Sequence, residues 1–320
     1  MWYIWFFIVV IVSGQNVTGP ITQDFQDWLN RNGYAQDDFV RADLGNAGSY
    51  GGRKNSSDKI AKEPVIFIHG NSDSALNSKS TGGVMSIATG WTNSINYFLS
   101  KEYQSRELYA TSWGNTNAME ASQRTHDCAT LTRLRRFLEA VLAYTNATKI
   151  DIIAHSMGVT LGRKLVQGGL VTGGNCDLGK SLESYVDTFV GLAGANYGLC
   201  NCMGGSQQTC NKQNGFWPGD SCGQNLYTCS INPPLYPCSN PTYSAYLTSL
   251  NNNPIKIASY VYSAWSQDDD LIMFKDLVWG RPTSLIPNST AQKVYSKLTH
   301  MQTKENTAAD QYNMVVQHTI

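Results

Sequence analysis

The sequence predicts an α/β protein in which a mostly parallel sheet is flanked by helices. The first observation is a set of short apolar runs, such as residues 64–69 and 150–154, which are typical of strands buried on both faces of a parallel sheet. The second is that segments with apolar residues at helical spacing alternate with these runs, which is the order that builds parallel sheets. The third is that the 320 residues contain no visible internal repeat, so we expect a single domain.

The individual elements follow from local patterns. Phe25, Trp28 and Leu29 fall on one side of a helix expected at 22–32. Residues 34–63 are polar and glycine-rich without periodicity, and they predict a long irregular segment. Besides the two runs above, strands are expected at 108–111, 185–193, 255–263 and 293–298. Further helices are expected at 84–99, at 128–144, directly after Gly158 and at 307–317.

The charge balance and the first residues indicate the kind of environment. With 24 basic and 24 acidic residues, the chain has no basic field that would attract nucleic acid or anionic lipid. Residues 1–12 are almost wholly apolar or aromatic, and small residues follow at 13 and 14, as in a secretory signal peptide. About a dozen apolar residues are too few for a membrane span of ~20. We therefore expect a signal peptide at 1–14, and a secreted single domain at 15–320 without a transmembrane segment.

The eight cysteines agree with secretion. Six of them lie within residues 200–238, and an even number of clustered cysteines favours disulfides in an oxidising compartment. A zinc site is the rival interpretation, but the spacing after Cys200 and Cys202 is irregular and the cluster contains no histidine. We expect a disulfide-stapled insertion at 200–238, with its pairing left open. The sequons at Asn16, Asn55, Asn146 and Asn288 would accept glycans in a secreted glycoprotein.

The segment Ala-His-Ser-Met-Gly at 154–158 has the pattern of a turn that holds a catalytic serine. It lies between a predicted strand and a predicted helix, which is the setting of the nucleophile elbow, a sharp turn that exposes a serine. The turn needs small residues two positions before and after the serine, and Ala154 and Gly158 meet this need. The pattern predicts Ser156 as a catalytic nucleophile.

A serine nucleophile needs a histidine base and a carboxylate that orients it. In sheets of this kind both follow the serine in the chain, in loops at the carboxyl ends of strands. His69 and His126 precede the serine, and His155 adjoins it. His318 lies two residues from the end of the sequence, so His300, expected at the start of a loop after the last strand, is the predicted base.

The carboxylate is expected among three adjacent aspartates at 268–270, directly after a predicted strand. Asp269 is favoured because Leu271 and Ile272 could dock its loop on the core, and Asp270 is the alternative. Asp268 ranks last.

The negative oxygen of the tetrahedral intermediate needs two backbone N–H donors. One is expected from Met157, which follows the nucleophile. The other is expected from Asn71, because Gly70 permits a tight turn after the strand at 64–69. His69 is expected to brace this loop rather than to act as a second base.

With these residues in place, the sequence resembles a secreted class 2 lipase of the α/β-hydrolase superfamily. It is similar to small bacterial lipases and closer to nematode-type relatives. The resemblance is carried by residues 64–70, 109–114, 151–158 and 193–196 and resumes over 262–300. It implies the α/β-hydrolase fold and the roles given above for Ser156, His300, Asp269 or Asp270, Asn71 and Met157. The insertion at 200–238, absent from the small bacterial enzymes, could form a lid or narrow the acyl pocket.

The function expected from these patterns is an extracellular lipase or esterase. It would cleave acylglycerol-type lipid esters through an acyl-enzyme on Ser156, with contact to a lipid interface and no nucleic-acid partner. No metal or organic cofactor is expected, because this chemistry uses side chains and water. Two alternatives are a secreted lipid-binding protein that has lost catalysis, and a thioesterase or peptidase with the same triad. Acyl-chain length and headgroup are left open.

Overall fold

A computed structural model describes residues 17–78, 89–202, 206–219, 224–225, 230–231 and 243–320. The signal peptide expected at 1–14, the sequon at Asn16 and much of the insertion at 200–238 lie outside the described residues. No helix in the described ranges combines the length and the apolar character that a bilayer crossing requires.

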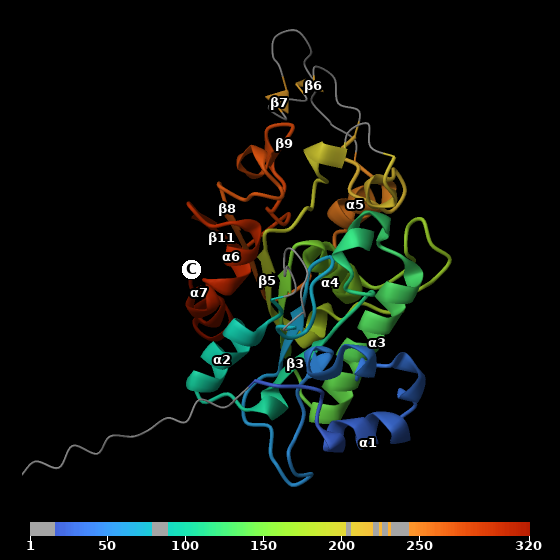
Figure 1. The fold of residues 1–320 in the computed structure, drawn as a ribbon, viewed down its shortest axis with the longest axis vertical. Coiled ribbons are helices and arrows are strands. Elements are labelled where there is room, and N and C mark those ends of the chain that lie inside the picture. The colour runs from blue at the N-terminus through green and yellow to red at the C-terminus, as the bar shows by residue number, and fades with distance from the viewer. Residues whose placement is uncertain (1–16, 79–88, 203–205, 220–223, 226–229, 232–242) are drawn as a thin grey trace, which may run out of the picture.

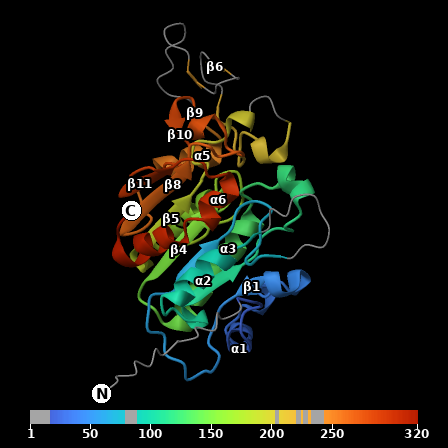
Figure 2. The same cartoon turned by 60° about the vertical axis from the view of Figure 1, so that its left-hand side comes forward.

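The described residues form a seven-stranded sheet in the order β1-β3-β2-β4-β5-β8-β11 (Figure 1). All neighbouring strands pair in parallel except β1 and β3, which are antiparallel. The mostly parallel sheet is therefore confirmed, and Figure 2 shows β4, β5, β8 and β11 as neighbours. The strands are β1 Ser49–Tyr50, β2 Val65–Ile68, β3 Leu108–Thr111, β4 Ile150–His155, β5 Val186–Leu192, β8 Tyr260–Ser266 and β11 Ala291–Tyr295.

Helices cover both faces of the sheet. On one side of Figure 1 lie α1, α3, α4 and α5, and on the other lie α2, α6 and α7. Strand β4 has apolar side chains on both faces. Ile152 packs into the core under α1, α3, α4 and α5, and Ile153 packs into the core on the opposite face, under α2. The helices are α1 Gln23–Arg31, α2 Thr92–Ser100, α3 Cys128–Thr145, α4 Met157–Gln167, α5 Ala245–Asn252, α6 His300–Glu305 and α7 Ala308–Tyr312, which continues as a π-helix at Asn313–Gln317.

Several element predictions were displaced or incomplete. The strand predicted at 255–263 lies at Tyr260–Ser266, because Ile257 and Ala258 pack into the core from a loop before the ladder begins. The segment predicted as irregular, 34–63, contains the two-residue strand β1, which is too short to show periodicity. Helix α5 was not predicted.

The disulfides of the described residues join Cys128 to Cys176 and Cys202 to Cys210. Cys200 is also disulfide-bonded, and no described cysteine is free. The disulfide interpretation is confirmed for these residues over the zinc site. Small two-stranded sheets, β6 Gln224–Asn225 with β7 Ser230–Ile231 and β9 Leu277–Val278 with β10 Arg281–Pro282, accompany the main sheet.

Candidate active site

Ser156 lies on the sharp turn between β4 and α4. Its backbone has φ 56° and ψ −128°, a conformation that side chains with a Cβ rarely adopt and that costs energy. The turn is fixed because the Ser156 N–H donates to the carbonyl of Leu192 at 2.9 Å. Every other residue from 150 to 167 is buried, whereas Ser156 is partly exposed. The strained turn therefore presents one hydroxyl at the carboxyl end of the sheet.

Two glycines allow the end of β2 to approach this turn. A Cβ on Gly158 would lie 2.5 Å from the carbonyl oxygens of Ile68 and His69. A Cβ on Gly70 would lie 2.8 Å from the Cβ of Ser156. A Cβ atom essentially never lies this close to a non-bonded atom, so a larger residue at either position would force the backbone of β2 or of the serine turn to shift. The loop that begins at Gly70, and with it the Asn71 backbone, thus lies directly against the serine.

His69 fixes the first peptide of that loop. The Trp113 backbone N–H donates to His69 Nε2 at 2.8 Å, so the ring proton is on Nδ1, which donates to the Gly70 carbonyl at 2.7 Å. The two rings stack at 5.2 Å, and burial lowers the pKa of His69 to about 4, which keeps the ring neutral. In a trans peptide the C=O and the next N–H point in opposite directions. Holding the Gly70 carbonyl therefore sets the direction of the Asn71 N–H.

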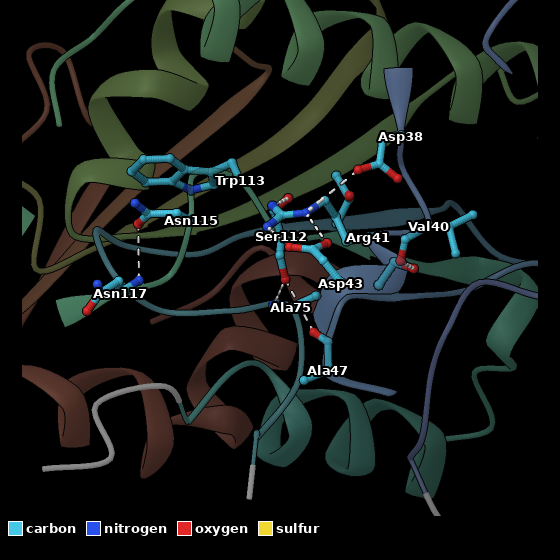
Figure 3. A network of polar contacts seen from close by, with 12 residues as sticks. Asp38, Val40, Arg41, Asp43, Ala47, Ala75, Ser112, Trp113, Asn115 and Asn117 are labelled. Atoms are coloured by element: carbon cyan, nitrogen blue, oxygen red, sulfur yellow. Dashed lines mark hydrogen bonds and ion pairs between the residues drawn. The ribbon is translucent and has the colours of Figure 1, made fainter. Parts of the chain in front are cut away.

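The rest of this loop is held by polar contacts from elsewhere in the chain. The Ala75 N–H donates to Ser112 Oγ at 2.8 Å, and Ser112 Oγ donates to the Ala47 carbonyl at 3.2 Å (Figure 3). Arg41 donates to the Ser112 carbonyl at 2.9 Å and pairs with Asp43 at 2.8 Å. Ser112 thus connects the loop after β2 to the segment before β1.

The Asn71 side chain is also engaged. Its Nδ2 donates to the Ala121 carbonyl at 2.9 Å, and its Oδ1 accepts from Arg124 at 2.7 Å. Arg124 donates to Ser72 Oγ as well, at 2.6 Å. Both polar atoms of the Asn71 side chain are therefore engaged, and its backbone N–H makes no hydrogen bond within the described residues. Sequence reasoning gave no role to Ser112 or Arg124: Ser112 lies in the segment 109–114 that resembles the family but received no function there, and Arg124 belongs to no motif.

His300 and Asp269 form a buried pair. His300 Nδ1 and Asp269 Oδ2 are 2.7 Å apart, and both side chains are buried. Asp269 Oδ1 accepts the backbone N–H groups of Leu271 at 2.9 Å and Ile272 at 2.7 Å. Burial alone would raise the pKa of Asp269, but these hydrogen bonds and the charge of His300 hold it below its usual value. Nδ1 thus faces the carboxylate, and within the described part of the chain His300 Nε2 has no hydrogen-bond partner.

The three adjacent aspartates each bind a different group. Asp270 Oδ1 accepts the backbone N–H of His300 at 2.8 Å, and Asp268 Oδ2 accepts that of Lys297 at 2.7 Å. Only Asp269 among them reaches the imidazole. Of the two residues thought to dock its loop, Ile272 is buried but Leu271 is 49% exposed.

His300 is the first residue of α6, so its expected place at the start of a loop was wrong. Thr299 caps this helix, since its hydroxyl accepts the Gln302 N–H at 3.2 Å while the Gln302 side chain accepts the Thr299 N–H at 3.0 Å. A helix of six residues whose buried side chains are polar carries no apolar period, although the capping pair was readable.

His155 joins the serine turn to this helix. Its Nε2 donates to the His300 carbonyl at 3.1 Å, and the two rings lie 4.6 Å apart. Burial and then the charge of His300 hold the pKa of His155 well below its usual value. His300 therefore lies against the residue that precedes Ser156. Within the described residues the Ser156 hydroxyl makes no hydrogen bond to His300; hydrogen bonds between a nucleophile and its base are often long in enzymes without substrate and tighten in the complex.

The other two histidines lie elsewhere. His126 is buried between the Asn214 carbonyl at 2.8 Å and Thr160 Oγ1 at 2.7 Å. His318 contacts Asp187 at 2.9 Å, at the amino end of β5. Within the described residues neither histidine forms a hydrogen bond with Ser156.

Another buried carboxyl, that of Asp276, lies in the loop after Asp269. Ser284 Oγ is 2.5 Å from Asp276 Oδ1 and 2.8 Å from the Gly194 carbonyl. One hydroxyl proton cannot serve both acceptors, so both contacts are satisfied when Asp276 is protonated. Burial, and then the nearby charge of Asp269, raise the pKa of Asp276 to about 7, in agreement with this geometry.

In the described ranges, one group of side chains has the spacing of metal ligands: Glu63, Asp151 and Asp187, whose ligand atoms lie within 4.8 Å of one another. This group is at the amino ends of β4 and β5, on the opposite edge of the sheet from Ser156. The Asp151 carboxylate accepts the Thr188 N–H at 3.0 Å, and burial raises its pKa well above the usual value. The group does not bear on the chemistry of Ser156.

Comparison with known proteins gives the following matches. The sequence model of the family described as "Lipase (class 2)" matches residues 62–313. No curated protein matches significantly. Similar solved structures include Aspergillus fumigatus lipase B, with 10% identity and a TM-score of 0.45, where 83% of this chain covers 55% of that chain. Bacillus licheniformis lipase BlEst2 in its mature form is 10% identical with a TM-score of 0.46, and the match covers 82% of this chain and 96% of that one. Paleococcus ferrophilus monoacylglycerol lipase is 12% identical with a TM-score of 0.43, and the match covers 85% of this chain and 98% of that one.

Proposed function

The chain belongs to the class 2 lipase family, and we propose that it is an extracellular serine hydrolase that cleaves acylglycerol-type lipid esters. The family itself indicates hydrolysis of lipid esters in general. The location, the acyl-enzyme route and the residue roles below are our proposal. The observation that carries it is the partly exposed, strained Ser156 turn, against which the buried His300–Asp269 pair is packed.

In the proposed reaction, Ser156 Oγ attacks the ester carbonyl carbon while His300 Nε2 accepts its proton. Asp269 stabilises the resulting imidazolium through the 2.7 Å contact with Nδ1. The backbone N–H groups of Met157 and Asn71 bind the negative oxygen. The alcohol leaves with the proton from His300, and water then attacks the acyl-enzyme through the same steps.

The geometry supports Asp269 over Asp270 as the orienting acid. Asp269 contacts the ring nitrogen of His300, whereas Asp270 contacts only its backbone N–H. Asp269 also receives two backbone N–H donors, which keep its carboxylate fixed in direction.

The disulfides support an extracellular location. Cys128–Cys176 and Cys202–Cys210 would not persist in a reducing cytosol. We therefore propose that residues 1–14 are removed as a signal peptide and that residues 15–320 form the mature domain. Contact with a lipid interface is part of the proposal.

The sequons of the described residues are open to glycosylation. Asn55, Asn146 and Asn288 are all exposed. Each precedes a parallel strand: Asn55 comes before β2, Asn146 before β4 and Asn288 before β11. These three asparagines therefore lie on the side of the sheet where the parallel strands begin, opposite the Ser156 turn.

The deciding experiment is labelling with a fluorophosphonate probe. The secreted wild-type protein should be labelled, Ser156→Ala should abolish the label, and His300→Ala should slow it by orders of magnitude. His318→Ala is the matched control and should label like wild type. Unchanged labelling of Ser156→Ala would refute the assignment.

The same preparation separates the alternatives. A wild-type protein that is silent to the probe but co-purifies with lipid would indicate a lipid-binding protein without catalysis. A labelled protein that prefers thioester or anilide substrates over esters of the same acyl chain would indicate a thioesterase or a peptidase.

A further inference from the structure

A fully buried ion pair joins α6 to the loop after β2. Lys304 Nζ is 2.5 Å from Asp73 Oδ2, and the two side chains are 1% and 3% exposed. The ammonium also donates to Thr89 Oγ1 at 2.8 Å and to the Gly90 carbonyl at 2.6 Å. An ammonium has three N–H donors, so each of them has an acceptor.

Both oxygens of the Asp73 carboxylate are hydrogen-bonded as well. Asp73 Oδ1 accepts the backbone N–H groups of Ser74 and Gly90, both at 2.9 Å. Asp73 therefore fixes the backbone of its own loop and receives Lys304 on its other oxygen. The contact bridges 231 positions of the sequence.

Both partners are close in the chain to residues of the proposed reaction. Lys304 follows His300 by four residues, which is about one turn of α6. Asp73 follows Asn71 by two residues, in the loop whose first peptide His69 holds. The first turn of α6 is held separately, by His155 at the His300 carbonyl. Lys304 ties the last turn of the same helix to the loop that carries Asn71.

The energetics of buried ion pairs argue for a geometric role. Replacing such a pair with apolar side chains is often neutral or stabilising, so a buried ion pair is weak evidence for a contribution to net stability. A displacement of about 1 Å between reacting groups can lower turnover about 100-fold. We propose that Lys304 and Asp73 are positioning residues, which set the distance between the His300 base and the Asn71 N–H donor; this rests on the proposed function.

The test compares Lys304→Met with a matched control. Lys164 is also buried, at 6% exposure, and donates to the carbonyls of Gly168 and Leu170 at the far end of α4. Both variants should lose thermal stability. On a soluble p-nitrophenyl ester, assayed well below the melting temperature, Lys304→Met should lose about 10- to 100-fold in kcat with KM within about twofold. Lys164→Met should keep kcat within about twofold.

A double variant, Asp73→Asn with Lys304→Met, separates position from stability and serves if the single variant does not fold. The amide oxygen of Asn still accepts the backbone N–H groups of Ser74 and Gly90, while both buried charges are removed. We expect it to recover the melting temperature while kcat stays low. Recovery of kcat together with the melting temperature, or unchanged kcat in folded Lys304→Met, would overturn the proposal. Failure of the proposed function looks different, because then the wild type itself neither hydrolyses the ester nor reacts with the fluorophosphonate probe.

Discussion

Replacing Asp269 with Asn should move the ring proton of His300 from Nδ1 to Nε2 without changing the shape of the site. The two backbone N–H groups at Leu271 and Ile272 donate to the same oxygen, Oδ1. An Asn at this position keeps its amide oxygen there, because only the oxygen accepts hydrogen bonds. Its NH₂ group then faces His300 Nδ1, 2.7 Å away, and must donate to it. The ring proton moves to Nε2, which can no longer accept the proton of Ser156.

The expected loss of kcat in Asp269→Asn follows from the wrong tautomer of His300. A wrong imidazole tautomer with intact geometry costs about 10⁴-fold in kcat, or ~5.5 kcal/mol of transition-state stabilisation. Asp270→Asn keeps an oxygen for the His300 backbone N–H at 2.8 Å, so its kcat should stay within about tenfold of wild type.

The assay is kcat and KM on a soluble ester near pH 8, with the rate of fluorophosphonate labelling measured beside it. Circular dichroism spectra should show that both variants are folded. The reasoning is refuted if Asp270→Asn loses as much activity as Asp269→Asn, or if Asp269→Asn remains within tenfold of wild type.

Three further outcomes are expected. Gly158→Ala would place a methyl group 2.5 Å from two carbonyl oxygens, so it should give little folded protein, and wild-type expression and labelling would contradict the close packing. The pKa of Asp276 is raised to about 7 in the folded protein. Its contribution to the free energy of unfolding is therefore fully present below the usual pKa of an aspartate and is lost as pH rises through about 7, at up to about 1.4 kcal/mol per pH unit. In Asp276→Asn the melting temperature should fall less between pH 5 and 8 than in wild type, and equal slopes would exclude this carboxyl as the source. Removing the Cys128–Cys176 disulfide, which closes a loop of 48 residues, should lower the free energy of unfolding by about 4 kcal/mol in urea titrations, and a change below about 1 kcal/mol would not fit the loop-closure model.

The parts of the fold that the sequence could predict are those with a strong local pattern. The strand at Leu108–Thr111 and the helix at Cys128–Thr145 were predicted within a residue. The strand is a short run of consecutive buried residues, and the helix has leucines that recur at helical spacing. β1 and α6 were missed because a two-residue strand and a six-residue helix with polar buried side chains have no period to detect.

The candidate site divides in the same way. The strand–turn–helix pattern predicts Ser156 as the nucleophile, and chain order predicts His300 as the base. The structure brings the two segments together, and both roles stay predictions. The choice between Asp269 and Asp270 depends on how the loop turns after β8, and adjacent identical residues carry no signal of that. The Lys304–Asp73 contact could not be predicted, since two residues 231 positions apart meet only once the sheet has formed.

The position of the three sequons has a practical consequence. Parallel strands gather their amino ends on one side, so sugar chains on Asn55, Asn146 and Asn288 would all project from the back of the molecule. A lectin-coated bead would then hold the protein at the amino ends of its strands and leave the Ser156 turn exposed to solvent. Such an immobilised preparation should accept emulsified substrate as freely as the dissolved protein does.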